Sequence, residues 1–378
     1  MKKTFEEVVL FARTGLNPRQ NFKLGQGNNN YITIKNIKNN SLVIDDNTDV
    51  VDDEAIKLIH KRSQIKKGDV LFASIGRMGD MFIIEEEPIG WDINESVFAF
   101  TLNTNIVKQK YFYYIFRVKS TLDYLISNSS GSTFKSIKMN QLKKMVFDIP
   151  PLEEQDYIIS VLDKVCDVIE KRKQELEFLD NLIKARFVEM FGCIHDGRFD
   201  MKTLLEIVND DKNSIKRGPF GGALKKEDFV EDGYLVYEQR HAIHNDFEYA
   251  KYYINQEKYE DMIGFKVIPG DLIISCSGVT LGRIAEVPEG AKEGIINQAL
   301  LKLSLNPHIM MNTFFIQQFR GEEIQNILFG FSRGSGIPNM PSMSEVKAVK
   351  FICPPLELQK EYCDFVHQVD KSKFMKSF

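Results

Sequence analysis

The sequence predicts an α+β protein in which two tandem, pseudo-repeated domains are joined by long antiparallel coiled-coil helices. The first observation is a phrase that occurs twice, as IPPLEEQ at residues 149–155 and as CPPLELQ at residues 353–359. The second is length, because 378 residues exceed what one hydrophobic core usually serves. The third is that each proline pair is followed by a glycine-free segment with the 4-3 apolar spacing of a heptad repeat.

These observations divide the chain into four expected segments. They are a first domain at residues 1–150, a long central helix at 151–192, a second domain at 193–352 and a shorter helix at 353–378. The repeat extends into both domains, because Gly68-Asp69 recurs as Gly270-Asp271. One duplication of about 200 residues is therefore predicted, and not an array of short repeats.

Local composition predicts the elements inside each domain. The runs DVLFASI at residues 69–75 and DLIISCS at residues 271–277 are short, apolar and flanked by glycine, so buried strands are expected there. Residues 108–128 have helical apolar spacing, which predicts a helical stretch packed on the sheet. A proline pair then ends the last strand and begins the helical arm of each domain.

The segment after the first proline pair predicts one long helix. No glycine or proline interrupts it before Gly192, and Glu153 and Glu154 suit the positive end of the helix dipole. Its expected length is about 38 residues or about 57 Å, whereas about 22 residues remain for its partner. The two helices are expected to pack antiparallel through an apolar seam that includes Leu162, Val165, Ile169, Leu176, Leu179 and Ile183.

Several classes of protein lack their signatures in this sequence. The cysteines and histidines have no convincing metal-ligand spacing, and no GxxxxGK[ST] phosphate loop or GxSxG nucleophile turn occurs. Leucine follows both proline pairs, whereas an amino-methyltransferase needs an aromatic residue there. No apolar run is long enough to span a membrane, and Glu6 and Glu7 interrupt any signal-peptide core. We therefore expect a non-catalytic binding protein in the cytoplasm.

The order of these segments resembles the specificity subunit of type I restriction-modification systems. Three stretches carry the resemblance: the duplicated Pro-Pro-Leu-Glu-x-Gln, the loop KRGPFGGALKKEDFV at residues 216–230, and PGDLIISCSGVTLGRIAEV at residues 269–287. The last two are similar to the target-recognition domains of that family. The resemblance covers nearly the whole chain, and its specificity comes from the order and duplication of stretches that are individually weak.

The resemblance implies a division of labour within a larger complex. Each recognition domain would read one half of a split site in double-stranded DNA, and the helices would act as a ruler between the halves. The same helices would dock two methyltransferase subunits, and restriction subunits would join for cleavage. This chain would hold no cofactor, because S-adenosylmethionine, ATP and magnesium would belong to those partners. The short second helix departs from the family pattern.

A DNA-binding surface needs cations for phosphates and arginine, asparagine or glutamine for base edges. Since the net charge is −4, such a surface must be a local patch. Loops at equivalent positions of the two domains supply these residue types. The candidates are Thr14, Arg19, Lys35, Asn36, Lys38, Arg77, Lys135, Lys216, Arg217, Phe220, Lys225, Gln239, Arg240, Arg283 and Arg333.

These candidates are expected to play different roles. Gln239, Arg240 and Asn36 have side chains suited to base edges, whereas Arg217 is expected to contact phosphates. Phe220 could wedge or stack against the duplex, and its glycine-rich loop would let the backbone approach DNA closely. An alternative from another class is a non-catalytic coiled-coil scaffold with two protein-binding domains, which the long helix would suit equally well.

Overall fold

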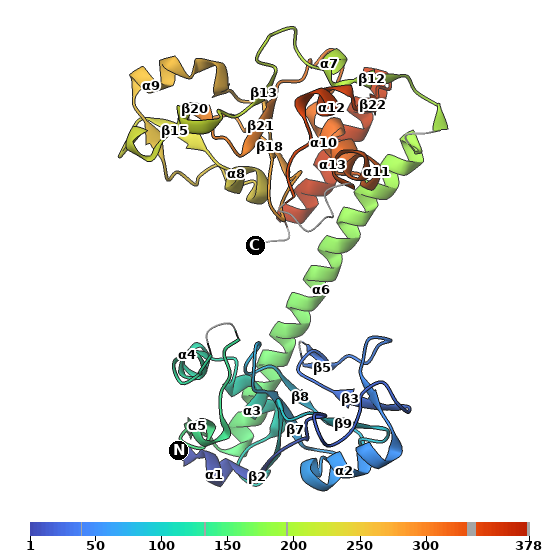
Figure 1. Ribbon diagram of the computed structural model, residues 1–378, viewed down its shortest axis with the longest axis vertical. Coiled ribbons are helices and arrows are strands. Elements are labelled where there is room, and N and C mark those ends of the chain that lie inside the picture. Colours follow the sequence, from blue (N-terminus) through green and yellow to red (C-terminus); the bar gives the residue numbers. More distant parts are fainter. Residues whose placement is uncertain (39, 132–133, 194–195, 331–337, 376–378) are drawn as a thin grey trace. The chain divides into compact units, whose positions relative to one another are not determined.

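The structure is a computed structural model that describes residues 1–38, 40–131, 134–193, 196–330 and 338–375. The chain divides into two compact units, Met1–Lys171 (unit 1) and Arg172–Phe378 (unit 2). The boundary between the units falls inside a single long helix, α6 (Leu152–Phe191), so each unit includes part of that helix. The elements of each unit are labelled in Figure 1.

Unit 1 consists of short strands and helices before α6. Its elements are β1 (Lys2–Thr4), α1 (Phe5–Val8), β2 (Val9–Thr14), β3 (Asn29–Ile32), β4 (Ile37–Lys38), β5 (Ser41–Leu42), β6 (Val50–Val51), α2 (Asp53–Ser63), β7 (Val70–Ala73), β8 (Met81–Ile83), β9 (Trp91–Ile93), β10 (Val97–Leu102), α3 (Gln109–Ile115), α4 (Lys119–Ser127), α5 (Met139–Leu142) and β11 (Val146–Asp148).

Unit 2 repeats this alternation after α6. Its elements are β12 (Met201–Thr203), α7 (Leu204–Ile207), β13 (Ile215–Arg217), β14 (Phe229–Val230), β15 (Tyr234–Tyr237), α8 (Gln239–His244), β16 (Tyr253–Ile254), α9 (Gln256–Asp261), β17 (Lys266–Val267), β18 (Leu272–Ser275), β19 (Ile284–Glu286), β20 (Gly294–Ile296), β21 (Leu300–Leu303), α10 (Asn312–Arg320), α11 (Glu322–Phe329), α12 (Met343–Ala348), β22 (Lys350–Ile352) and α13 (Leu356–Met375).

The two units share three features of sheet topology. A four-stranded sheet has the order β2-β10-β7-β8 in unit 1 and β13-β21-β18-β19 in unit 2. The first and last strands of each unit also pair, as β1 with β11 and β12 with β22. A parallel pair recurs too, as β3 with β9 and β15 with β20. This agreement confirms the tandem repeat that the sequence predicts.

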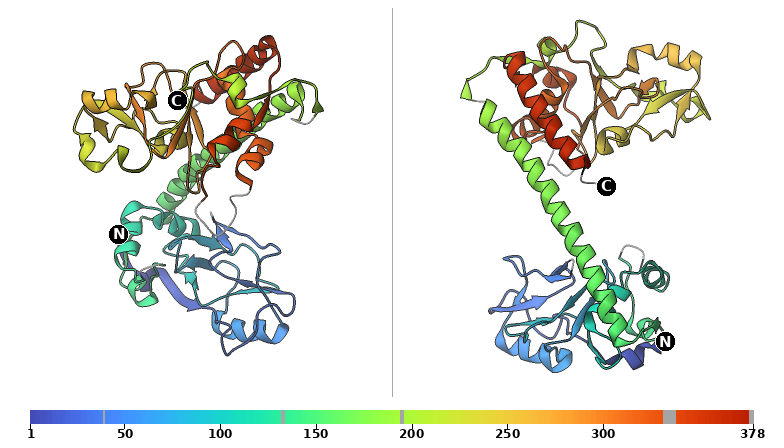
Figure 2. Two further views of the ribbon diagram at one scale, coloured as in Figure 1. Left: turned by 45° about the horizontal axis from the view of Figure 1, so that its top comes forward. Right: turned by 180° about the vertical axis from the view of Figure 1, so that it is seen from behind.

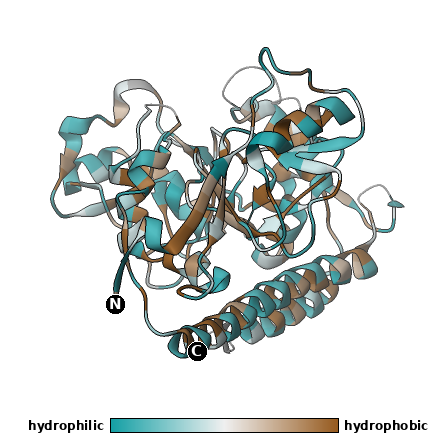
Figure 3. Cartoon of the chain, turned by 90° about the horizontal axis from the view of Figure 1, so that it is seen from below, coloured by the Kyte–Doolittle hydropathy of each residue, from teal (hydrophilic) through white to brown (hydrophobic). Residues whose placement is uncertain are grey.

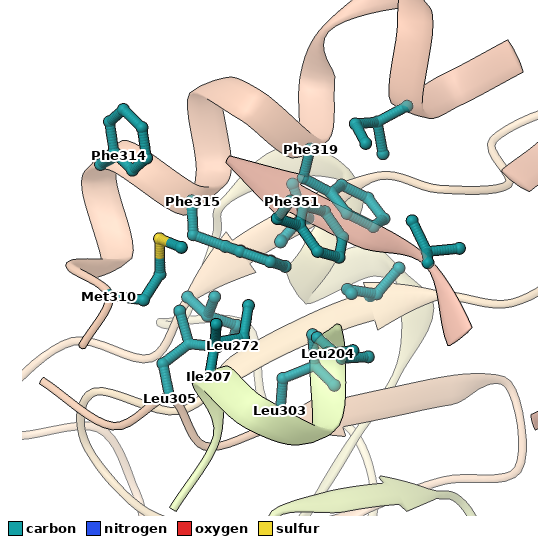
Figure 4. Close-up of a cluster of buried hydrophobic side chains, with 14 of the residues drawn as sticks. Leu204, Ile207, Leu272, Leu303, Leu305, Met310, Phe314, Phe315, Phe319 and Phe351 are labelled. Carbon is teal, nitrogen blue, oxygen red and sulfur yellow. The ribbon is translucent and has the colours of Figure 1, made fainter. Parts of the chain in front are cut away.

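The predicted buried strands form the centre of each sheet. Every residue of β7 and of β18 is buried, as their continuous apolar runs require. In unit 2, helix α10 covers this sheet with Phe315 and Phe319, which lie near Phe351 of β22 (Figure 4). Each fully buried phenylalanine contributes about 1.5–3 kcal/mol to the free energy of unfolding, so these rings stabilise the helical layer on the sheet.

The helical stretch predicted at residues 108–128 is confirmed, and the structure divides it into two helices. Helix α3 ends at Ile115, and Val118 has an extended backbone with ψ 137° before α4 begins. Phe116, between them, is buried in the core of unit 1. Unit 2 repeats the break at Gly321, between α10 and α11. Apolar spacing alone does not reveal such a break, because both helices bury residues on the same sheet.

The glutamine of the first repeated phrase joins the start of α6 to the sheet domain of unit 1. Gln155 is completely buried in the first turn of α6. Its Oε1 accepts a hydrogen bond from the backbone N–H of Lys108 at 2.9 Å. Its Nε2 donates to the carbonyl oxygens of Ile106 and Pro150, both at 2.8 Å. One amide thus ties the proline pair and the start of α6 to the segment that precedes α3.

The second copy of the phrase makes the same three hydrogen bonds. Gln359 is completely buried in α13 and accepts from the backbone N–H of Met311 at 2.9 Å. It donates to the carbonyl oxygens of Ile309 at 2.9 Å and Pro354 at 2.8 Å. We call each such set of three hydrogen bonds a glutamine clamp. The phrase therefore recurs because each unit joins its helical arm to its sheet domain by the same clamp.

Within unit 2, the end of α6 packs antiparallel to α13. The ammonium of Lys373 pairs with Asp180 at 2.7 Å, and the Tyr362 hydroxyl donates to the carbonyl of Ile183 at 3.2 Å. Residue numbers thus rise along one helix as they fall along the other, and Figure 2 shows the two helices side by side. Leu179 and Ile183 belong to the same hydrophobic cluster as Tyr362, as the predicted seam requires.

The predicted seam is wrong in the first half of α6. Val165 is 49% exposed and Ile169 is 50% exposed, and Leu162 is only partly buried. Leu176, in the second half of the helix, is also only partly buried. Helix α13 has 20 residues whereas α6 has 40, so α13 can follow only about half of α6. Apolar residues nevertheless recur among polar residues along the paired helices (Figure 3).

Candidate nucleic-acid interface

Arg217 and Phe220 stand at the end of strand β13 in unit 2. The Arg217 guanidinium lies 5.2 Å from the centre of the Phe220 ring, and its Nη2 donates to Oδ1 of Asn339 at 3.3 Å. Phe220 is 67% exposed, so its ring is available to a ligand. An exposed aromatic ring held beside an arginine is the combination that nucleic-acid surfaces use for stacking and for phosphate contact.

Two further segments meet this position. Nε2 of Gln239, the first residue of α8, donates to Oγ of Ser277 at 2.9 Å. Ser277 in turn forms an antiparallel bridge with Asn339. The segments that contain Arg217, Gln239, Ser277 and Asn339 are therefore linked at one end of the sheet. We call these four residues with Phe220 the unit 2 cluster.

The other cations predicted to contact DNA in unit 2 lie near side chains outside the unit 2 cluster. Lys216 lies 4.8 Å from the Phe265 ring, and Arg240 lies 4.4 Å from the Tyr249 ring. Lys225 pairs with Glu227 at 3.5 Å, and exposed Arg283 lines a hollow of about 640 Å³. None of these contacts is a buried ion pair, so these cations remain candidates for contacts with phosphates.

Close packing against a neighbouring backbone segment requires glycine at position 218. A Cβ on Gly218 would lie 1.8 Å from the carbonyl oxygen of Asn297, and a Cβ on Gly15 would lie 1.7 Å from that of Ile93. Both glycines directly follow the edge strands β2 and β13. The chain's own backbone thus accounts for glycine at position 218, and the close approach of this loop to DNA stays a prediction.

Unit 1 presents a related but chemically different surface. Thr14, at the end of β2, donates through its hydroxyl to the carbonyl of Glu95 at 3.1 Å. Arg77 donates to the carbonyl of Ile37 at 2.9 Å and pairs with Asp80 at 3.3 Å. The other predicted cations of this unit are exposed; they are Arg19, Lys35, Lys38 and Lys135. Threonine thus occupies the strand end at which unit 2 has arginine.

Asn36 does not fit its predicted role as a base reader. The side chain is buried, and its Oδ1 accepts from the backbone N–H of Thr33 at 2.9 Å. Its Nδ2 donates to the carbonyl of Val43 at 3.0 Å and to the hydroxyl of Thr48 at 3.2 Å. Because both amide hydrogens and the amide oxygen are used, Asn36 stabilises its own loop. Arg333, also predicted, lies outside the described residues.

Ser277 and Asn339 were not predicted from the sequence. Their bridge has a counterpart in unit 1, where Ile75 pairs with Ser136, and each is about 200 positions from its equivalent. A second hydrogen bond joins the same two segments of unit 1, from the backbone N–H of Gly76 to the carbonyl of Lys135. Alignment of the two polar glycine loops would have found both residues, since the loops recur at the offset of the whole repeat.

A thiol lies beneath the unit 2 cluster but does not react readily. Burial raises the pKa of Cys276 to about 12, although the nearby Arg217 acts in the opposite direction. The thiol therefore stays protonated at neutral pH, and a thiolate is required for nucleophilic chemistry. Among the described residues, no group of three His, Cys, Asp or Glu side chains could hold a metal ion. None of the described helices is long and apolar enough to cross a membrane.

The family model described as type I restriction modification DNA specificity domain matches residues 1–178 and 219–376. The chain therefore belongs to this family.

Individual relatives match parts of the chain. It is 36% identical over 85 residues to the type I restriction enzyme MjaIX specificity subunit of Methanocaldococcus jannaschii, which is 22% of this chain and 20% of that one. It is 24% identical over 133 residues to the HindI specificity subunit of Haemophilus influenzae, which is 34% of this chain and 29% of that one. The matched segments thus span less than a third of these relatives.

Solved structures share the fold over nearly the whole chain. The S subunit of a type I restriction-modification system from M. genitalium covers 99% of this chain and 90% of its own, with 15% identity and a TM-score of 0.54. A chain from a study of complex assembly and conformational transition in the type I R-M system covers 99% of this chain and 91% of its own. Its identity is 15% and its TM-score is 0.56.

Proposed function

We propose that this chain is the sequence-specific DNA-binding specificity subunit of a type I restriction-modification complex. Each unit reads one half of a bipartite site in double-stranded DNA, and the helices α6 and α13 set the spacing between the halves. One observation carries the proposal: the same sheet and loop framework occurs twice in a chain of this family, with different side chains at equivalent loop positions. A repeated framework with different loops suits the reading of two different half-sites.

In this proposal the chain is not itself an enzyme and holds no cofactor. S-adenosylmethionine, ATP and magnesium belong to methyltransferase and restriction subunits, and this chain acts with them in the cytoplasm. A non-catalytic scaffold with two protein-binding domains is not favoured, since the family model describes a DNA specificity domain.

The function is tested by selecting DNA with the assembled complex. The chain is co-expressed with its methyltransferase subunits, and random duplexes bound by the complex are sequenced. The expected result is a motif of two short specific halves separated by a spacer of fixed length. Methylation of the selected sites identifies the same motif independently. A single uninterrupted motif, or binding without sequence preference, would contradict the proposal.

Contacts with phosphates and with bases are expected to respond differently to substitution. Arg217→Ala should weaken binding to all sequences and reduce the salt dependence by about one unit, because a phosphate contact carries no sequence information. Lys216→Ala should act in the same direction. Gln239→Ala should instead relax specificity in one half-site, with a loss of about 1–3 kcal/mol for the preferred base. Fluorescence anisotropy across a salt series measures both effects.

A matched control separates these effects from a general loss of charge. Arg198 is paired with Asp196 at 2.8 Å and lies outside the proposed surface. Arg198→Ala should leave both affinity and salt dependence unchanged. If Arg198→Ala and Arg217→Ala weaken binding equally, the assignment of the surface is wrong.

The first half of α6 presents an apolar face that fits a partner protein. Tyr157, Val161, Val165 and Val168 are between 41% and 69% exposed. Their spacing of four, four and three residues places them on one face of the helix. The opposite side of this segment is held by unit 1, where Asp163 pairs with Lys110 at 2.7 Å. We assign the exposed face to the docking of a methyltransferase subunit.

A charged residue on this face should prevent assembly without unfolding the chain. Val168→Glu is expected to abolish co-purification with the methyltransferase subunit, because a carboxylate would be buried without a partner. Val188→Glu is the matched control, since Val188 is 57% exposed and lies about 180° around the same helix. Size-exclusion chromatography with light scattering measures assembly. Equal loss of assembly in both variants would place the docking site elsewhere.

A further inference from the structure

In each four-stranded sheet, a turn leads into an inner strand, β10 in unit 1 and β21 in unit 2. The two turns carry different polar residues at equivalent positions. In unit 1 the turn between β9 and β10 contains Asn94 and Glu95. The backbone N–H of Asn94 donates to the carbonyl of Ile32 at 2.8 Å, and its Oδ1 accepts from the N–H of Ser96 at 3.0 Å. The turn is thus fixed on both sides of Glu95.

Unit 2 builds the same turn between β20 and β21. The backbone N–H of Asn297 donates to the carbonyl of Tyr237 at 2.9 Å, and its Oδ1 accepts from the N–H of Ala299 at 3.0 Å. The residue between Asn297 and Ala299 is Gln298. Glu95 and Gln298 therefore occupy the same place in two copies of one turn, although one is an anion and the other a neutral amide.

Both turns lie beside the strand ends that carry predicted DNA-binding residues. The carbonyl of Glu95 accepts from the hydroxyl of Thr14, at the end of β2. In unit 2, a Cβ on Gly218 would lie 3.0 Å from the Cα of Gln298, beside the strand end that carries Arg217. Each residue therefore borders the strand end from which its unit presents the predicted DNA-binding residues.

The side chain of Glu95 is partly exposed, and one of its carboxylate oxygens, Oε2, is buried. Burial, followed by the charge of Glu95, raises the pKa of the neighbouring Tyr31, whose hydroxyl donates to the carbonyl of Leu16 at 2.6 Å. A carboxylate at this strand end can accept a hydrogen bond but cannot donate one.

Gln298 differs from Glu95 in charge and in exposure. The residue is exposed and lines a hollow of about 610 Å³ with Asn297, Glu238 and Tyr252. None of the hydrogen bonds described for the part of the chain that the structure covers uses its side chain. An amide offers one acceptor and one donor side by side, which matches the N6 and N7 edge of adenine.

We infer that Glu95 and Gln298 are equivalent specificity-determining residues that give the two half-sites different bases. Glu95 accepts a hydrogen bond from the exocyclic amino group of a cytosine, and Gln298 makes a bidentate contact with an adenine. A carboxylate repels phosphates, so Glu95 contributes to DNA binding only through a base edge. This inference rests on the proposed function, because it names what the same surface reads.

Reciprocal isosteric substitutions test the inference in the assembled complex. Random duplexes are selected with the full chain and its methyltransferase subunits, for the wild type and for Glu95→Gln and Gln298→Glu. Glu95→Gln should change one position of one half-site from cytosine to adenine, with about a 5- to 150-fold loss of affinity for the original site. Gln298→Glu should change one position of the other half-site from adenine to cytosine.

The controls distinguish this inference from a structural role and from the proposed function. Glu85→Gln, the same change at an exposed residue of unit 1, should leave the motif unchanged. If the wild type selects a bipartite motif and neither variant changes a base in it, the inference is wrong and the proposed function stands. A uniform loss of affinity for all sequences would also overturn it. If the wild type selects no bipartite motif, the proposed function fails and this inference fails with it.

Discussion

Gln359→Met is expected to lower the free energy of unfolding of unit 2 by about 3–5 kcal/mol. Methionine keeps the length of the side chain but leaves the N–H of Met311 and the carbonyls of Ile309 and Pro354 without their partner. Each buried group that loses its hydrogen bond costs about 1–3 kcal/mol. Since a typical domain is stable by about 5–15 kcal/mol, the loss should be evident in a denaturant titration.

The same helix provides a matched control. Gln368 is exposed on α13, so Gln368→Met should change the unfolding free energy by less than about 0.5 kcal/mol. Hydrogen exchange locates the effect, because protection should fall in unit 2 and persist in unit 1. Gln155→Met should produce the reverse pattern, with the loss in unit 1. Equal denaturation midpoints for Gln359→Met and Gln368→Met would show that the glutamine clamp contributes no stability.

Exchange of one unit's sheet domain is expected to change one half of the recognised DNA and leave the other half intact. Residues 193–352 are replaced by the corresponding segment of a related specificity subunit, and the methylated motif of cells that carry the hybrid and its methyltransferase is sequenced. The physical reason is that each unit has its own hydrophobic core and its own set of loops. The native helices and both clamp glutamines are retained in the hybrid. Gln359 bonds only main-chain groups, so its clamp is expected to form again with the backbone of the new segment.

The reciprocal exchange of residues 1–150 provides the control. It should change the half-site that the first hybrid preserves and keep the half-site that the first hybrid changes. If either hybrid alters both halves together, the two units do not read DNA independently, and the assignment of one half-site to each unit is wrong.

Much of the framework was predictable because it depends on patterns that are local in sequence. Continuous apolar runs gave the buried strands β7 and β18, and the long segment without glycine or proline gave α6. The duplication gave the equivalence of the two units. The repeated glutamine could be read from the sequence, but its hydrogen bonds could not. Two of the three bonds in each clamp join it to a segment nearly 50 residues away.

The predictions that failed depend on tertiary contacts. Asn36 has the side chain of a base reader, but its loop folds so that the amide is consumed internally. Val165 and Ile169 follow heptad spacing, but spacing does not say which partner covers them. The exposed candidates Arg19, Lys35 and Lys135 remain predictions, since exposure alone does not distinguish a phosphate contact from a solvated lysine or arginine.

The glutamine clamp has a consequence for how proteins of this kind can diversify. Because the same hydrogen bonds fasten each helical arm to its sheet domain, the chain has two joints of identical construction. A crossover between genes within the stretch that encodes either joint would connect a foreign domain to a native arm without disturbing the connection itself. The recombinant chain would have an intact junction and a new pair of domains. The number of possible specificities would therefore equal the number of first domains multiplied by the number of second domains.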